Sequence, residues 1–246
     1  MNRIEDKSIS ISVNRTLTAY LVFIHVLLVV VIAKSDFIDR VATKFGFAPQ
    51  ELPSHYQAMA EFHDRVDQNV PAQSVLFIGD SHIQGLAVSA VTDHAVNFGI
   101  GGDTTVGVMK RLRRYQSLTS VKAVVLAIGF NDLRLRSNAE IIKRMGEILT
   151  YLDERASVVL CAVIPVGQKE HEAFNQRIRN LNASLKEMVS RHNRVTYLDS
   201  FSGLLTPQGY LPSHYHVSDG VHLSEQGYAH WISQLAQSLK SAEKGN

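Results

Sequence analysis

The sequence of 246 residues contains one cysteine, so no intramolecular disulfide can form. Cys161 stands inside the apolar run of residues 157–165, with no histidine or acid beside it. We therefore expect a buried, unreactive side chain. The chain also lacks internal repeats, low-complexity stretches and any long basic run interleaved with aromatics, and its formal net charge is only +2. Nothing in this balance indicates a nucleic-acid-binding protein.

The overall composition is that of a globular protein, with 45% hydrophobic and 20% charged residues. About 200 residues follow the first few dozen, which is enough for one domain with a three-layer core. A short basic cluster falls on a predicted helix, where we expect it to form a solvated face. The cluster comprises Lys110, Arg111, Arg113 and Arg114.

Residues 17–33 contain no Asp, Glu, Lys or Arg and read LTAYLVFIHVLLVVVIA. As a helix this run is about 26 Å long, the short end of a membrane span. A cleavable signal peptide is the alternative, because Val31-Ile32-Ala33 resembles a cleavage site. The long apolar run and the long tail of residues 1–16 favour a signal-anchor. A short tail before the span and a large domain after it favour a periplasmic or cell-surface domain.

After a connector and helix over residues 34–70, strand-like and helix-like segments alternate in a domain of residues 71–242. The helix over residues 51–68 has Tyr56, Met59, Phe62 and Val66 on one side. Strands are predicted at residues 74–79, 95–100, 123–129, 157–164 and 195–198. Helices are predicted at residues 83–91, 105–115, 139–155, 170–192 and 224–239. This alternation predicts a three-layer α/β/α fold with a five-stranded parallel, flavodoxin-like sheet.

In such a sheet, functional residues gather after the carboxyl ends of the strands. Gly79-Asp80-Ser81-His82 follows the first strand and places a serine hydroxyl at the start of a helix. Ser81 is a candidate nucleophile, and a simple helix cap is the alternative. The lipase elbow G-x-S-x-G is absent.

Two further loops carry candidate hydrogen-bond donors. The block NFGIGGDTT, residues 97–105, follows the second strand, and its glycines allow close approach to a ligand. A phosphate-binding loop is the alternative, but neither G-x-G-x-x-G nor a Walker lysine is present. Asn131 follows the third strand; its amide suits a developing oxyanion, although Asn-Asp is also a common turn pair.

Near the end of the chain, Asp219 precedes His222 by three residues, a spacing that lets a carboxylate orient an imidazole. With Ser81 this satisfies the order of nucleophile, orienting acid and base. A metal site is the alternative, because His214 and His216 are also potential ligands beside Asp219 and His222.

These four blocks together resemble the SGNH, or GDSL-type, hydrolase superfamily, over residues 72–240. The resemblance implies Ser81 as nucleophile, Asp219 and His222 as its triad partners, and Ser81, Gly102 and Asn131 as oxyanion-hole donors. It implies no metal and no cofactor. The block NFGIGGDTT is similar to that of platelet-activating-factor acetylhydrolase catalytic subunits, which implies short acyl groups. His82 departs from the GDSL pattern, and we expect it at the edge of the pocket.

The expected function is a serine ester hydrolase that cleaves a small acyl ester of a small molecule, lipid or glycan. Alternatives within the same chemistry are transfer or removal of O-acetyl groups on cell-surface polysaccharide, and lysophospholipase or thioesterase activity. An alternative from another class is a non-catalytic domain that binds glycan or lipid with a vestigial site. The membrane is the expected partner of the N-terminal helix.

Overall fold

Five apolar runs form one parallel sheet in the computed structural model, which describes residues 15–34, 51–167 and 172–244. The strands are β1 (Val75–Gly79), β2 (Ala95–Gly99), β3 (Ala123–Ala127), β4 (Ser157–Cys161) and β5 (Val195–Leu198). Their order across the sheet is β2-β1-β3-β4-β5, and all neighbouring strands are parallel. The predicted five-stranded parallel sheet of flavodoxin-like order is therefore confirmed.

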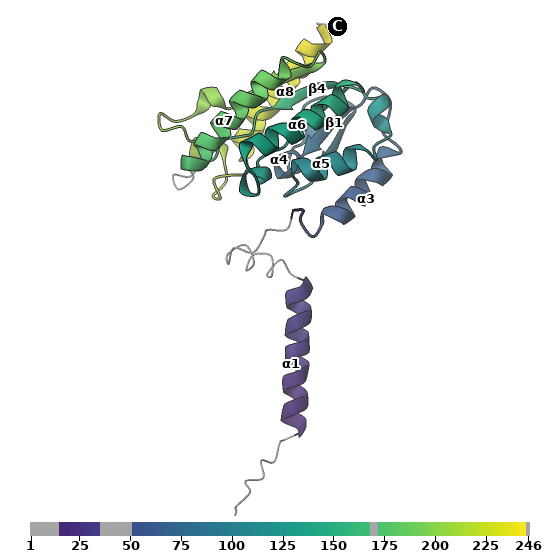
Figure 1. The fold of residues 1–246 in the computed structure, drawn as a ribbon, viewed down its shortest axis with the longest axis vertical. Helices are drawn as coiled ribbons and strands as arrows, with labels where there is room; N and C mark the ends of the chain where they lie inside the picture. The colour runs from purple at the N-terminus through teal and green to yellow at the C-terminus, as the bar shows by residue number, and fades with distance from the viewer. Residues whose placement is uncertain (1–14, 35–50, 168–171, 245–246) are drawn as a thin grey trace, which may run out of the picture. The chain divides into compact units, whose positions relative to one another are not determined.

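The central strands are buried on both faces because successive side chains point to opposite sides of the sheet. In β1, Leu76 and Ile78 pack into one apolar cluster, while Val75 and Phe77 pack into another. Helices on both faces complete these two cores (Figure 1). One face is covered by α5 (Thr105–Leu112), α6 (Asn138–Asp153) and α7 (Glu172–Val189), and the other by α4 (Ser81–Gln84) and α8 (Glu225–Lys244). The predicted three-layer α/β/α architecture is confirmed.

The predicted helix over residues 83–91 is wrong in extent. α4 begins at Ser81 and ends at Gln84, and a short 3-10 helix covers Val88–Ala90. The side-chain amide of Asn97 in β2 donates to the carbonyl oxygens of Ile83 and Leu86 at 2.7 and 3.0 Å. These bonds satisfy carbonyls that a longer helix would otherwise use, so the helical turn that begins at Ser81 ends at Gln84.

The helix before the sheet, α3 (Tyr56–Asp67), buries Tyr56 and packs Met59 and Val66 against the core, as predicted, but its most buried face is rotated away from Phe62. Phe62 is exposed, whereas the buried residues are Tyr56, Ala60, His63 and Asp67. The polar groups on this face all find partners: for example, the Tyr56 hydroxyl donates to the carbonyl of Gly107 at 2.6 Å. Specific hydrogen bonds therefore set the orientation of α3.

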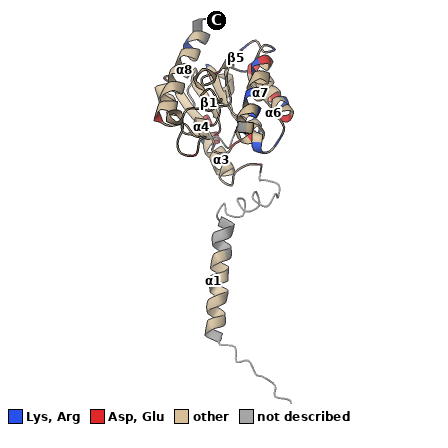
Figure 2. Cartoon of the chain, turned by 90° about the vertical axis from the view of Figure 1, so that its left-hand side faces the viewer, with Lys and Arg blue, Asp and Glu red and all other residues tan. Residues whose placement is uncertain are grey.

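The chain divides into two units, Met1–Gln50 and Glu51–Asn246. In the first unit the structure describes one helix, α1 (Arg15–Lys34), and none of residues 17–28 is charged (Figure 2). Among the described residues, no helix has the length and apolar character that crossing a membrane requires. The predicted tail up to residue 14, the connector residues 35–50 and the predicted helix start at residues 170–171 lie outside the described residues.

Candidate active site

The candidate residues lie on four segments that meet at the carboxyl edge of the sheet. Ser81 follows β1, Gly102 follows β2, and Asn131 follows β3. Asp219 and His222 belong to the loop between β5 and α8. This placement agrees with the expectation that chemistry in a parallel sheet collects where the strands end.

Ser81, His222 and Asp219 form one continuous line of contacts. The Nε2 atom of His222 lies 2.9 Å from the Oγ atom of Ser81, and its Nδ1 atom lies 2.6 Å from Oδ2 of Asp219. Both distances are hydrogen-bond distances. The side chains of Asp219 and His222 are each 46% exposed, so a substrate can reach the imidazole from solvent.

The loop itself holds Asp219 in place. Its Oδ1 atom accepts hydrogen bonds from the backbone N–H groups of Val221 and His222 at 2.8 and 3.0 Å. Gly220, which directly follows Asp219, adopts a positive φ of 71°. Burial alone would raise the pKa of Asp219, but these backbone N–H groups and the hydrogen bond with His222 lower it to about 2. The carboxylate is therefore ionised and oriented before any substrate arrives.

Gly102, in the loop after β2, presents a backbone N–H donor. It has a φ of 75°, which favours glycine, and it is exposed. Among the described residues, none accepts a hydrogen bond from its N–H. The N–H of the preceding Gly101 is instead taken by Oε1 of Gln84 at 2.7 Å. Of these two glycines, the geometry leaves Gly102 able to bind an oxyanion.

Asn131 is fixed to the same loop. Its Nδ2 atom donates to the carbonyl oxygen of Asp103, the residue after Gly102, at 2.9 Å. A side-chain amide has two N–H donors, so this bond orients the group and leaves the second N–H for a ligand. The bond also couples the positions of the two candidate donors, Gly102 and Asn131.

A buried ion pair stabilises this edge of the sheet, and it corrects the prediction of a solvated basic cluster for Arg111, whereas Lys110, Arg113 and Arg114 are exposed as predicted. Arg111 is fully buried, and its Nε atom donates to Oδ2 of Asp103 at 3.0 Å. Its Nη2 atom donates to the carbonyl oxygen of Gly79, the last residue of β1, at 3.1 Å. Arg111 therefore joins the end of β1 to the glycine loop. No sequence signal marks it, because it stands among three other basic residues.

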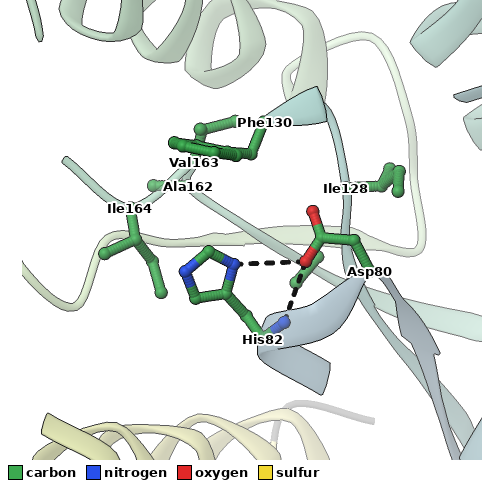
Figure 3. A pocket seen from close by; sticks show the side chains of 8 residues that line it. Asp80, His82, Ile128, Phe130, Ala162, Val163 and Ile164 are labelled. Atoms are coloured by element: carbon green, nitrogen blue, oxygen red, sulfur yellow. Dashed lines mark hydrogen bonds and ion pairs between the residues drawn. The ribbon is translucent and has the colours of Figure 1, made fainter. Parts of the chain in front are cut away.

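His82, which we expected at the edge of the pocket, is buried. Its ring lines a small cavity with Asp80, Ile128, Phe130 and Val163 (Figure 3). The Nδ1 atom lies 3.2 Å from Oδ1 of Asp80, and the ring centroid lies 5.8 Å from that of His222. The side chains of Asp80 and His82 therefore form a buried pair next to the candidate triad.

The metal alternative receives no support from the side-chain positions. Among residues 15–34, 51–167 and 172–244, no group of three or more His, Cys, Asp or Glu side chains could hold a metal ion. His216 instead hydrogen-bonds through Nδ1 to the carbonyl of Val217 at 2.6 Å.

Burial raises the pKa of the Cys161 thiol to about 12, so this side chain is unreactive, as its apolar surroundings predict.

Comparison with known proteins agrees with this arrangement. The family model of the GDSL-like lipases and acylhydrolases matches residues 77–230. The chain belongs to the GDSL-like Lipase/Acylhydrolase family. It is accordingly a carboxylic ester hydrolase, and the family supports small-molecule or glycan acyl esters as substrates.

Three individual proteins illustrate what this GDSL-type hydrolase is similar to. The rat platelet-activating factor acetylhydrolase IB subunit alpha1 is 28% identical over 183 residues, which are 71% of this chain and 75% of the relative. A GDSL-like lipase from Bacteroides thetaiotaomicron is 18% identical, with a TM-score of 0.65 over 74% of this chain and 98% of that one. The acetylxylan esterase Axe2 from Geobacillus stearothermophilus is 16% identical, with a TM-score of 0.55 over 69% and 95%. The two structures share the fold.

Proposed function

We propose that the protein is a serine esterase that cleaves a short acyl ester through an acyl-enzyme on Ser81. The observation that carries this proposal is the unbroken contact line from Ser81 Oγ through the His222 ring to the Asp219 carboxylate. A serine that only capped a helix would not need a carboxylate-oriented imidazole at its hydroxyl.

In the first half-reaction, His222 Nε2 takes the hydroxyl proton while Ser81 Oγ attacks the acyl carbon. The carbonyl π electrons move to the oxygen, and the N–H groups of Ser81, Gly102 and Asn131 bind the resulting oxyanion. The carbon–oxygen bond to the alcohol then breaks, and the leaving alkoxide receives the proton from His222. Asp219 holds the imidazole in the tautomer that has Nδ1 protonated.

In the second half-reaction, His222 takes a proton from water, and the hydroxide oxygen attacks the acyl-Ser81 carbon. Collapse of this second tetrahedral intermediate breaks the bond to Ser81 Oγ, which regains its proton from His222. The products are a carboxylic acid and the free enzyme. No redox agent and no group beyond water enters this balance.

The decisive experiment replaces the nucleophile. We expect Ser81→Ala to abolish hydrolysis of p-nitrophenyl acetate and labelling by a fluorophosphonate probe, with an unchanged unfolding transition. Ser184→Ala is the matched control, because Ser184 lies exposed on α7 and its hydroxyl bonds only to the Asn180 carbonyl. Activity retained in Ser81→Ala, or absence of labelling in the wild type, overturns the proposal. Absence of labelling is also the result expected of a non-catalytic binding domain.

For the substrate, we propose an acetyl or similarly short acyl ester. The name of the rat relative, an acetylhydrolase, supports this choice at 28% identity. A series of p-nitrophenyl esters from acetate to decanoate tests it, and kcat/KM should fall as the acyl chain lengthens. Acetylated sugars and lysophospholipids, assayed in parallel, distinguish a glycan from a lipid alcohol, and formation of new acetyl-sugar distinguishes transfer from hydrolysis.

For location, we propose that α1 attaches the protein to a membrane with the catalytic domain outside the cytoplasm. The support is the uncharged apolar run in the sequence and the exposure of all residues 17–28 of α1. Alkaline carbonate extraction tests attachment, and protease accessibility in intact cells tests orientation. Recovery of the full-length protein in the soluble fraction contradicts the first, and protection from protease contradicts the second.

A further inference from the structure

His82 bridges the two segments that carry the candidate catalytic groups. On one side its Nδ1 atom contacts Oδ1 of Asp80, the residue before Ser81, at 3.2 Å. On the other side its Nε2 atom contacts the backbone carbonyl of Val221, the residue before His222, at 3.1 Å. The two partners of one imidazole are thus the immediate neighbours of the nucleophile and of the base.

Both ring nitrogens of His82 face hydrogen-bond acceptors. The Val221 carbonyl can only accept, and Asp80 Oδ1 also accepts the backbone N–H of His82 at 3.0 Å, as an ionised carboxylate does. With Asp80 as an ionised carboxylate, both contacts are hydrogen bonds when both ring nitrogens carry protons. The geometry therefore fits an imidazolium paired with the Asp80 carboxylate.

The surroundings leave this pair almost no exposure to solvent. His82 and Asp80 are 4% and 2% exposed, and Phe130 meets the imidazole edge-on at a centroid distance of 5.8 Å. Burial alone would lower the pKa of His82, but the hydrogen bond and charge of Asp80, the Val221 carbonyl and the charge of Asp219 together raise it. The electrostatics thus favour the same charged form that the contacts fit.

We propose that His82 is a positioning residue that, as a buried imidazolium, holds the His222 loop against the Ser81 turn. This inference rests on the proposed function, because it assigns His82 the task of setting the approach of His222 Nε2 to Ser81 Oγ. His82 itself touches neither of the reacting side-chain atoms. Its bond to the Val221 carbonyl crosses 139 positions of the chain and fixes backbone directly attached to His222.

Replacing His82 with leucine tests the bridge. The variant removes both side-chain bonds and leaves the Asp80 carboxylate without its counter-ion. Because displacement of a catalytic group by about 1 Å costs on the order of 10²-fold, we expect kcat for p-nitrophenyl acetate to fall about 10- to 100-fold. KM should stay within about twofold, since the bridge does not contact substrate. The end-point of fluorophosphonate labelling gives the number of folded sites to which kcat is normalised.

The matched control is His192→Leu, because His192 also pairs with a carboxylate, that of Asp153, with Nδ1 and Oδ2 3.5 Å apart. That pair lies at the end of α6 and before β5, at the opposite edge of the sheet. We expect His192→Leu to keep the wild-type kcat. Wild-type kcat in His82→Leu, or an equal loss in both variants, overturns the positioning role.

A second measurement depends neither on the folding of His82→Leu nor on catalysis. Nitrogen-15 NMR of the full-length Ser81→Ala protein at pH 7.5 reports the protons on each histidine ring. We expect both nitrogens of His82 to be protonated, and an unprotonated ring nitrogen at His82 overturns the proposal. If the wild-type protein neither cleaves esters nor labels, the proposed function fails, whereas this spectrum still decides the state of His82.

Discussion

The imidazole of His222 and the hydroxyl of Ser81 lie 2.9 Å apart although 141 positions separate them in the chain. The sheet brings about this proximity: β1 is an inner strand, so the turn after it opens at the centre of the carboxyl edge. The loop before α8 returns to the same edge and closes a small hairpin there. In this hairpin the Val217 N–H donates to the His222 carbonyl at 2.9 Å, and His216 and Leu223 form an antiparallel bridge. The base is therefore held by local backbone bonds as well as by Asp219.

The carboxylate behind His222 should be essential for rate and dispensable for folding. In Asp219→Asn, an amide replaces the acceptor for Nδ1–H and favours the wrong imidazole tautomer, so kcat should fall on the order of 10³- to 10⁴-fold. Steady-state hydrolysis of p-nitrophenyl acetate measures the loss. Asp153→Asn, in the distant pair with His192, should leave kcat unchanged. A loss below tenfold in Asp219→Asn contradicts the role given to Asp219.

The Asn131 amide should contribute mainly to the transition state. If its second N–H binds the developing oxyanion as proposed, Asn131→Ala should lower kcat on the order of 10²- to 10³-fold with little change in KM. The exposed Asn180 on α7 supplies the comparison, and Asn180→Ala should behave as wild type. An effect of Asn131→Ala on KM alone shows that the amide binds substrate but does not stabilise the oxyanion.

Arg111 should be critical for the stability of the fold. It is fully buried with its partner Asp103, so Arg111→Met leaves an unpaired buried carboxylate and should reduce the free energy of unfolding by about 3–5 kcal/mol. Urea denaturation followed by tryptophan fluorescence measures the change, since the single tryptophan, Trp231, is itself buried.

The matched comparison for Arg111 is an exposed pair of the same type. Arg191 and Glu187 lie 3.5 Å apart with about three quarters of each side chain exposed, and Arg191→Met should cost no more than about 0.5 kcal/mol. The double variant Arg111→Met, Asp103→Asn should recover part of the stability lost in the single variant. A double variant less stable than the single one shows that Asp103 has a role independent of Arg111.

The features predicted from sequence are those that local pattern determines. Continuous apolar runs indicate strands covered on both faces, and strand–helix alternation fixes a parallel sheet, so both the architecture and the edge that carries Ser81, Asn131 and His222 follow from the chain alone. The strand ends were predicted up to three residues too long, because the residues beyond Ala127 and Cys161 remain apolar after leaving the ladder.

Features that depend on partners distant in the chain were not predictable. Arg111 looks like its exposed neighbours until Asp103 and the Gly79 carbonyl are placed beside it. His82 gives no sequence signal of burial because its second acceptor, Val221, is supplied by the far end of the chain. On α3, the burial of His63 and Asp67 in place of Phe62 was likewise not predicted, because their hydrogen-bond partners Tyr115 and Ser117 lie about 50 residues further along the chain.

One such residue on α3, His63, should make the protein sensitive to acid. Burial and the nearby charge of Arg111 lower the pKa of His63 to about 3, and its Nδ1 atom lies 3.3 Å from the Tyr115 hydroxyl. The unfolded chain binds a proton at His63 below about pH 6.5, whereas the folded protein does not, so stability falls as the pH drops from 6.5 towards 3. At pH 5 this single group should lower the free energy of unfolding by about 2 kcal/mol relative to pH 7.5.

Substitution of His63 isolates this contribution from every other titrating group. Urea denaturation at pH 7.5 and pH 5 gives, for each protein, the loss of unfolding free energy between the two pH values. This loss should be about 2 kcal/mol smaller in His63→Gln than in the wild type. The absolute stability of His63→Gln does not matter, because each protein is compared with itself at the two pH values. Glutamine carries no titrating proton, so the variant lacks the contribution of His63. Equal pH dependence in the two proteins shows that His63 accepts a proton in the folded state, and that its site is open to water.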